Sequence, residues 1–360
     1  MAAFLVLLTL VLAFANGAND VSKGIATLVG SGTTNYRAAV AWGSAWTVAG
    51  GLVAALVSQG LVATFSGKGL LASPPPGNAF LLAVACGAIA WLILANLTGL
   101  PVSTTHALTG ALCGAGIAAA GLPGVAWSAV AKKAALPLAV SPVLSLVLML
   151  LFSPIVVPVF RRFHRFCVCV ERRETVGAPA GSVAAAALPS VEVVAGSDCP
   201  PETLVRVSAL DSLHWLSSGA TSFFRGLNDT PKILALGIAA AAGWGLGGSS
   251  LYALVALAMG LGSVLGGFRV TETLAKKVTK ISPDDGLLAN LTTSALVSAA
   301  SFWALPVSTT HVSSGAILGI AAGSKTAGIH WKTVREMLLA WVVTLPVAGF
   351  VAALVYRFAG

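Results

Sequence analysis

Long runs of apolar residues, separated by short polar stretches, fill almost the whole chain. They cover 2–30, 38–58, 79–98, 105–121 and 134–160, and later 213–243, 249–266, 286–304, 311–323 and 335–357. As α-helices, runs of about 20 residues cross a bilayer core of roughly 30 Å. None alternates apolar and polar residues as a barrel strand does. The pattern predicts an all-α integral membrane protein with about 10–12 transmembrane segments, embedded in a lipid bilayer.

Polar residues interrupt the first and the sixth apolar run. The first contains "FANGANDVSKG" from Phe14 to Gly24, which places Asp20 and Lys23 in an otherwise apolar segment. We interpret this segment as a retained first helix, because no basic residue precedes Lys23 as it would in a signal peptide. Glycine relaxes the helical backbone, so Gly17 and Gly226 predict broken helices at these two interruptions.

The chain repeats itself in two halves. "FANGANDVSK" at 14–23 returns as "FFRGLNDTPK" at 223–232, and "LPVSTTH" at 100–106 returns unchanged at 305–311. Such self-similarity identifies two homologous repeats, which we place at 1–160 and 213–360. Five apolar runs in each half mean that the halves cross the membrane in opposite senses. Inverted repeats with interrupted helices are typical of secondary transporters.

Charged residues concentrate between the halves and on one side of the predicted membrane. Only 9% of residues are charged, and 57% are hydrophobic. Residues 161–212 are polar and rich in Ala, Gly, Pro and Ser, which predicts a soluble, partly disordered linker. Placing both termini outside puts 14 of the 21 Lys and Arg residues in the cytoplasm. The positive-inside rule therefore predicts a multi-pass protein of the plasma (inner) membrane with a cytoplasmic linker.

The carboxylates in the two interruptions are the first candidate site. Asp20 and Asp229 occupy equivalent positions, and ionisable residues inside a membrane usually serve function. Asn19 and Asn228 offer oxygens that would coordinate a small hard cation such as sodium. The alternative is a purely structural ion pair on each helix, because each Asp is followed three positions later by a lysine.

The repeated "PVSTTH" sequence is the second candidate site. Proline and then serine or threonine start a helix, whose first N–H groups lack partners within the helix. Those N–H groups, the helix dipole and three hydroxyls form a binding site for an oxyanion. The candidate anion-binding hydroxyls are Ser103, Thr104, Thr105, Ser308, Thr309 and Thr310. Simple helix capping is the alternative, although two identical copies in inverted halves favour a shared site.

These motifs resemble the inorganic phosphate transporter (PiT) family. Its halves each carry a G-A-N-D-V and a P-V-S-T-T-H motif, here at 17–21 and 101–106 and again at 226–230 and 306–311. The resemblance implies a permease that imports phosphate together with sodium ions or protons by alternating access, without a cofactor. It implies that the Asn-Asp and Ser-Thr segments line one phosphate and cation site. Sulfate permeases of the same fold remain the alternative.

Two lysines depart from the family pattern. Lys23 and Lys232 stand three residues after each Asp, where the family usually has Asn. A lysine there would supply a tethered positive charge in place of a sodium ion, so we expect coupling to protons with little dependence on sodium. The cation-coupling candidates are Asn19, Asp20, Lys23, Asn228, Asp229 and Lys232. The alternative is that the lysines lie away from the site and reach toward an interface.

Other functional classes fit less well. A hydrolase using Ser103 or Thr104 with His106 would lack an evident residue to orient the imidazole and would leave the duplication unexplained. A passive anion channel is disfavoured because the buried carboxylates would repel the anion. We therefore predict that the protein is not an enzyme. The net charge of +9 is explained by the cytoplasmic loops without a nucleic-acid partner, and a homo-oligomer stays open.

Overall fold

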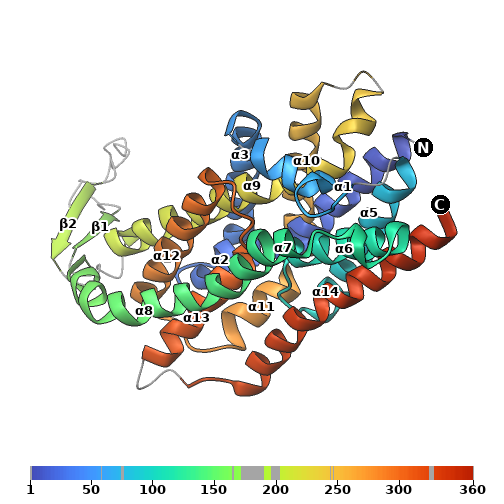
Figure 1. Cartoon of the computed structure of the whole chain (residues 1–360). Helices are drawn as coiled ribbons and strands as arrows, with labels where there is room; N and C mark the ends of the chain where they lie inside the picture. The colour runs from blue at the N-terminus through green and yellow to red at the C-terminus, as the bar shows by residue number, and fades with distance from the viewer. Residues whose placement is uncertain are drawn as a thin grey trace, which may run out of the picture.

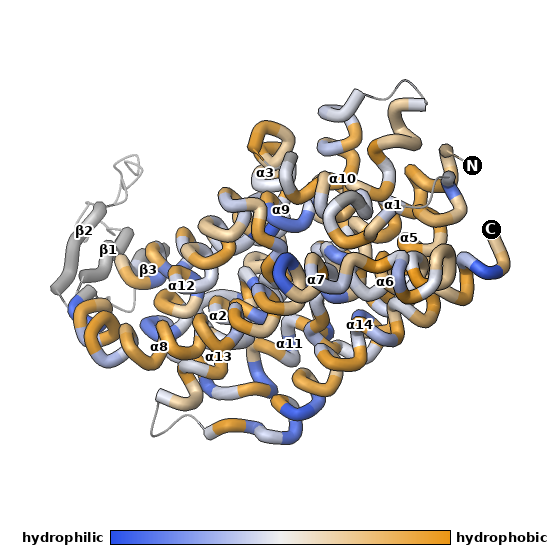
Figure 2. Tube along the Cα trace, viewed as in Figure 1, coloured by the Kyte–Doolittle hydropathy of each residue, from blue (hydrophilic) through white to orange (hydrophobic). Residues whose placement is uncertain are grey.

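The protein is a membrane-embedded helical bundle. The computed structural model describes residues 2–57, 59–73, 77–163, 166–171, 190–195, 203–243, 245, 247–323 and 328–359. Six described stretches of helix are long and apolar enough to cross a membrane: Ala2–Gly30, Tyr36–Val57, Asn78–Thr98, Trp127–Arg162, Gly248–Gly266 and Trp331–Ala359. Figure 2 shows apolar residues along most of the helices. The predicted all-α membrane architecture is confirmed.

All ten predicted apolar segments are helical. The first part of the chain forms α1 (Ala2–Asp20), α2 (Ser22–Gly30), α3 (Tyr36–Val57), α4 (Gln59–Ala63), η1 (Thr64–Lys68), α5 (Asn78–Thr98), α6 (Thr104–Ala120), η2 (Leu122–Gly124), α7 (Trp127–Ala129), η3 (Val130–Ala135) and α8 (Leu136–Phe163). The last part forms α9 (Ala209–Ala242), α10 (Gly248–Gly266), α11 (Phe268–Lys276), α12 (Pro283–Phe302), α13 (Thr309–Gly323) and α14 (Trp331–Ala359). The short helices between the apolar segments were not predicted.

The linker carries a small β-sheet that was not predicted from the sequence. Strands β1 (Phe166–Glu171), β2 (Ser190–Ala195) and β3 (Thr203–Ser208) pair antiparallel in the order β2-β1-β3. These segments are rich in valine, which favours strands. The linker residues 164–165, 172–189 and 196–202 lie outside the described part, so the predicted disorder is not tested. In Figure 1 the two termini lie at one end of the molecule and the strands at the opposite end.

The predicted helix breaks are only partly present. In the first half α1 and α2 are separated by the single residue Val21, whose N–H still bonds the Gly17 carbonyl at 3.2 Å. In the second half the predicted break is wrong, because α9 continues without interruption through Pro231. Close packing explains the glycines instead. A Cβ added at Gly17 would overlap the Met259 carbonyl on α10, and one at Gly226 would overlap the Thr47 carbonyl on α3.

Equivalent helices of the two halves make equivalent contacts. Helix α1 packs against α10, and its counterpart α9 packs against α3. In the same way α6 packs against α14, and its counterpart α13 packs against α8. Helices of each half therefore pack against helices of the other half, and this packing brings the two copies of each motif together.

Candidate functional site

The four motif segments meet in one buried cluster. The Asn-Asp segments lie at the end of α1, the start of α2 and the middle of α9, and the Ser-Thr segments form the starts of α6 and α13. Asp20 is 1% exposed and Asp229 2% exposed. Both motifs of both halves are thus brought into contact, as the following hydrogen bonds describe.

The Lys23 ammonium is enclosed by oxygens of its own motif. Its Nζ lies 2.8 Å from Asp20 Oδ1, 2.7 Å from Asn19 Oδ1 and 2.8 Å from the Asn19 carbonyl oxygen. An ammonium has three donors, so all three are used. Side chains that could coordinate a small cation instead surround a covalently attached one.

The Lys232 ammonium joins the two kinds of motif across the halves. Its Nζ lies 3.2 Å from Asp229 Oδ1, 2.9 Å from Thr105 Oγ1 and 2.9 Å from the Val307 carbonyl oxygen. Thr105 belongs to the Ser-Thr segment of the first half and Val307 to that of the second. Neither lysine reaches toward an interface, because both side chains are buried.

Asn16 lies between the two carboxylates. Its Nδ2 is 3.0 Å from Asp20 Oδ2, 3.3 Å from Asp229 Oδ2 and 2.8 Å from Thr104 Oγ1. This side chain links the two Asn-Asp motifs to the start of α6.

Arg225 is the third buried cation of the cluster. Its guanidinium donates to Thr47 Oγ1 at 2.7 Å and to Asn16 Oδ1 at 3.4 Å. Within the described part of the chain its Nε has no hydrogen-bond partner. A buried donor without a partner is costly, which makes this group available to an anion.

The two Ser-Thr segments contact each other symmetrically. Thr105 Oγ1 donates to the Val307 carbonyl at 3.2 Å, and Thr310 Oγ1 donates to the Val102 carbonyl at 2.7 Å. These are the same contact made in both directions, since position 105 of the first half corresponds to 310 of the second. The starts of α6 and α13 therefore lie side by side.

Ser103 and Ser308 cap the two helices, as the alternative interpretation predicted. The Ser103 hydroxyl accepts from the His106 N–H and the Ser308 hydroxyl from the His311 N–H, each at 3.2 Å. The two imidazole rings lie with their centroids 4.4 Å apart. Among the described residues, His106 Nδ1 and His311 Nε2 have no hydrogen-bond partner. The remaining predicted hydroxyl, Thr309, is buried at the first residue of α13.

A second equivalent pair supports the motif asparagines. Asn19 Nδ2 donates to Asn96 Oδ1 at 2.8 Å, and Ser301 Oγ donates to Asn228 Oδ1 at 3.4 Å. Asn96 and Ser301 precede the two "LPVSTTH" copies by the same number of residues. The Asn228 oxygen is thus engaged by Ser301, and the Asn19 oxygen is engaged by Lys23.

Five residues of this cluster were not assigned from the sequence: Asn16, Asn96, Arg225, His311 and Ser301. Asn16 and Arg225 stand at the same motif position in the two halves, which was a readable signal. The contacts of Asn96 and Ser301 depend on helix packing and carry no motif of their own.

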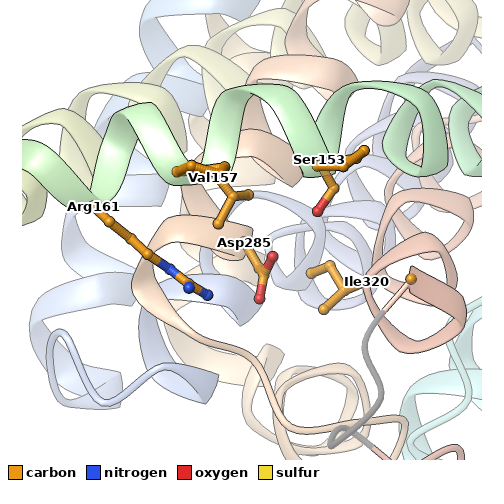
Figure 3. Close-up of a pocket in the computed structure, with 8 residues that line it drawn as sticks. Ser153, Val157, Arg161, Asp285 and Ile320 are labelled. Carbon is orange, nitrogen blue, oxygen red and sulfur yellow. The ribbon is translucent and has the colours of Figure 1, made fainter.

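The motif side chains are buried, and one pocket lies away from them. Figure 3 shows this pocket, lined by Ser153, Val157 and Arg161 of α8 together with residues of α12 and α13. Arg161 Nε lies 3.5 Å from Asp284 Oδ2 at the start of α12. None of the motif residues lines this pocket.

Comparison with known proteins gives consistent matches along the chain. A model of the phosphate transporter family matches residues 16–352. A probable low-affinity inorganic phosphate transporter of Mycobacterium tuberculosis is 31% identical over 98% of this chain and 77% of its own length. A protein of the same description from Bacillus subtilis is 29% identical over 98% of this chain and 95% of its own length.

One solved structure has the same fold. It is described as "The sodium-dependent phosphate transporter" and aligns with a TM-score of 0.77 at 20% identity, covering 99% of this chain and 98% of that one. At this identity the likeness concerns the fold. The resemblance predicted from the paired motifs is confirmed by the family match. With its motifs assembled in one buried cluster, this chain belongs to the phosphate transporter family.

Proposed function

We propose that this protein is a secondary active transporter that imports inorganic phosphate by cation-coupled symport with alternating access. The observation that carries the proposal is the single buried cluster formed by both copies of both motifs. It combines helix N-termini, hydroxyls and unpartnered donors, which bind oxyanions. The burial of these residues supports a site that is closed off from both sides at one stage of the cycle, as alternating access requires.

The charges of the cluster favour an anion. Lys23, Lys232 and Arg225 carry three positive charges, and Asp20 and Asp229 carry two negative charges, which leaves one positive charge in excess. An unbalanced charge inside a membrane protein is costly. A singly charged anion such as dihydrogen phosphate would neutralise the site.

Phosphate is favoured over sulfate by the nearby carboxylates. Near pH 7 phosphate keeps a proton that it donates to a carboxylate, whereas sulfate has none to donate. Asp20 Oδ2 and Asp229 Oδ2 both accept from Asn16, so a ligand bound next to this amide would have two carboxylate acceptors nearby. The phosphate-binding hydroxyls are proposed to be Ser103, Thr104, Thr105, Ser308, Thr309 and Thr310.

The coupling ion is proposed to be the proton. The tethered ammonium of Lys23 occupies three oxygens that would otherwise suit sodium, and Lys232 does so in the second half. Asn19, Asp20 and Asp229 would then hold lysine rather than a metal ion, whereas Asn228 Oδ1 accepts a hydrogen bond from Ser301. This coupling differs from the sodium dependence by which the similar solved transporter is described.

The chain is proposed to form two inverted repeats at 1–160 and 213–360, joined by a cytoplasmic linker. The reciprocal packing of α1 on α10 and α9 on α3 supports the repeats. The position of the strands opposite the two termini in Figure 1 supports a linker on the other side of the membrane from both ends. Together with the distribution of basic residues, this favours both termini outside.

Uptake of labelled phosphate into proteoliposomes tests the function. We expect accumulation above the external concentration when an inward proton gradient is imposed, and weak competition by excess sulfate. Equilibration without accumulation would indicate a channel instead. Strong inhibition by sulfate would favour the alternative oxyanion permease.

A further inference from the structure

A second buried polar network lies between α2, α9 and α12. His214 Nε2 lies 3.1 Å from Thr27 Oγ1, which donates to Asn290 Oδ1 at 3.1 Å. Thr221 Oγ1 donates to the Asn290 carbonyl at 3.1 Å and lies 2.9 Å from Ser294 Oγ. All five residues are buried. We call this network the α9–α12 polar interface.

The interface extends from the motif cluster toward the surface. At one end His214 Nδ1 lies 3.3 Å from Thr33 Oγ1, a half-buried hydroxyl in the loop between α2 and α3. At the other end Thr221 is one helical turn before Arg225 of the motif cluster on α9. On α12, Val297 and Ser298 stand at helical spacing between Ser294 and Ser301, and Val297 is buried. About two helical turns thus separate the two polar regions on that helix.

The corresponding interface in the first half is apolar. The motif alignment pairs His214 with Leu5 and Thr221 with Leu12, because the two motif copies are 209 residues apart. The "LPVSTTH" copies are 205 residues apart, which pairs Asn290 with Ala85 and Ser294 with Ile89. The four first-half residues are buried in the apolar core. The equivalent helix pairs therefore differ at these positions, because α1 and α5 pack through apolar side chains and α9 and α12 through polar ones.

This asymmetry needs an explanation beyond helix packing. The α1–α5 contact demonstrates that the fold packs this position with apolar side chains alone. Buried polar groups add little to helix association in membranes, typically about 0.6 kcal/mol per interaction. They do provide acceptors and donors for a hydrated or charged solute once the helices separate.

We propose that the α9–α12 polar interface is the part of the translocation route between the motif cluster and the linker side of the protein. Its hydroxyl, amide and imidazole groups bind phosphate transiently after α9 and α12 separate. The inference rests on the proposed transport function. Because α9 begins directly after the linker strand β3, the His214 end of the interface lies toward the linker side.

Exchanging the interface for its first-half equivalent tests the inference. The variant carries His214→Leu, Thr221→Leu, Asn290→Ala and Ser294→Ile, side chains that already pack together between α1 and α5. We expect phosphate uptake to slow by about tenfold or more, the effect of losing at least one hydrogen bond to a charged ligand. Equilibrium binding of phosphate to the purified protein should stay within about threefold of wild type, a change under 1 kcal/mol.

The outcomes separate this inference from the proposed function. Near-normal uptake by the exchanged variant would show that the polar groups serve packing only. Loss of binding together with uptake would place these residues in the motif site and also contradict the inference. Wild-type protein that neither binds nor transports phosphate would instead refute the proposed function.

Thiol accessibility provides a second test that does not depend on the folding of the exchanged variant. In a variant with all five native cysteines replaced by serine, Ser294→Cys should react with an impermeant thiol reagent applied from the linker side. Added phosphate should slow that reaction. The equivalent Ile89→Cys is the matched control and should stay unreactive from that side. The inference would be overturned if Ser294→Cys were as unreactive as Ile89→Cys toward the reagent applied from the linker side.

Discussion

At the scale of single residues, each lysine of the motif cluster is bound by one carboxylate and by neutral oxygens, and Arg225 is bound by neutral oxygens. Lys23 is satisfied within its own motif, whereas Lys232 contacts Thr105 of the opposite half. The two lysines are therefore equivalent in sequence but different in their contacts. Of the two lysines, Lys232 is the one in direct contact with the Ser-Thr segments, so a movement of these segments would change its hydrogen bonds directly.

Loss of either carboxylate charge should abolish accumulation. In Asp20→Asn or Asp229→Asn the neighbouring ammonium keeps its position but loses its anionic partner, and breaking a buried ion pair costs about 3–5 kcal/mol. Phosphate accumulation in proteoliposomes measures the effect, with size-exclusion profiles to establish that the variants remain folded. Glu272→Gln is the control, because Glu272 on α11 forms a solvent-accessible ion pair with Lys277, away from the motif cluster. Normal accumulation by an Asp variant would exclude the carboxylates from the site.

Removal of a hydroxyl should weaken phosphate binding by a smaller amount. Thr104→Ala deletes the oxygen that accepts from Asn16 Nδ2 at 2.8 Å, and Thr309→Ala makes the equivalent change on α13. A hydrogen bond to a charged group contributes about 1.5–3 kcal/mol, so the half-saturation concentration should rise about 10- to 150-fold. Thr98→Ala is the control, because the Thr98 hydroxyl bonds only backbone carbonyls of its own helix. Unchanged half-saturation in both variants would mean that the hydroxyls only cap helices.

At the scale of helices, glycines set the distance between the crossing pairs. Gly262 of α10 lies against the Phe14 carbonyl of α1, which immediately precedes the first motif. A Cβ at this position would overlap that oxygen, so the two helices would have to move apart. The position of the Asn-Asp motif thus depends on Gly262, which has no side-chain functional group.

Gly262→Ala should therefore destabilise the protein, because overpacking costs about 1–3 kcal/mol. The measurement is the thermal unfolding midpoint of the purified protein in detergent. Gly248→Ala on the same helix is the matched control, because a Cβ there meets no atom within 4 Å. Equal midpoints for the two variants would contradict the close packing of α1 and α10.

The helices could be predicted from the sequence because lipid requires backbone groups to be satisfied within each segment. The helix break predicted from Gly226 was wrong, since this glycine serves the close packing of α9 against α3 and the helix continues past it. The equivalent motif positions of Asn16 and Arg225 were readable from the repeat, but their contact with each other depends on the packing of α1 against α9. The strands of the linker were missed because a composition rich in Ala, Gly and Pro elsewhere in the linker dominated the prediction.

At the scale of the whole molecule, the proposed topology is directly testable. Alkaline phosphatase is active only outside the cytoplasm, and green fluorescent protein is bright only when it folds inside. A phosphatase fused after Gly360 should be active, and one inserted in the linker near residue 185 should be inactive. The fluorescent fusions should give the opposite pattern, and the reverse result at either point would overturn the orientation.

The ion dependence that we expect of the transport cycle follows from Lys23 and Lys232. Because one ammonium is held by Asp20 and another by Asp229, we propose that the site does not need sodium to balance its carboxylates. In Lys23→Asn/Lys232→Asn both tethered charges are absent, and the asparagine oxygens and carboxylates become available to a free cation. Uptake by this double variant should either require sodium or be lost.

Phosphate accumulation under separately imposed proton and sodium gradients tests the central claim most directly. Wild-type proteoliposomes should accumulate phosphate with an inward proton gradient in sodium-free buffer, and adding a sodium gradient should change the initial rate by less than about twofold, well under 1 kcal/mol in the barrier. Wild-type uptake that rises steeply with sodium and ignores the proton gradient would contradict the account and identify sodium as the coupling ion.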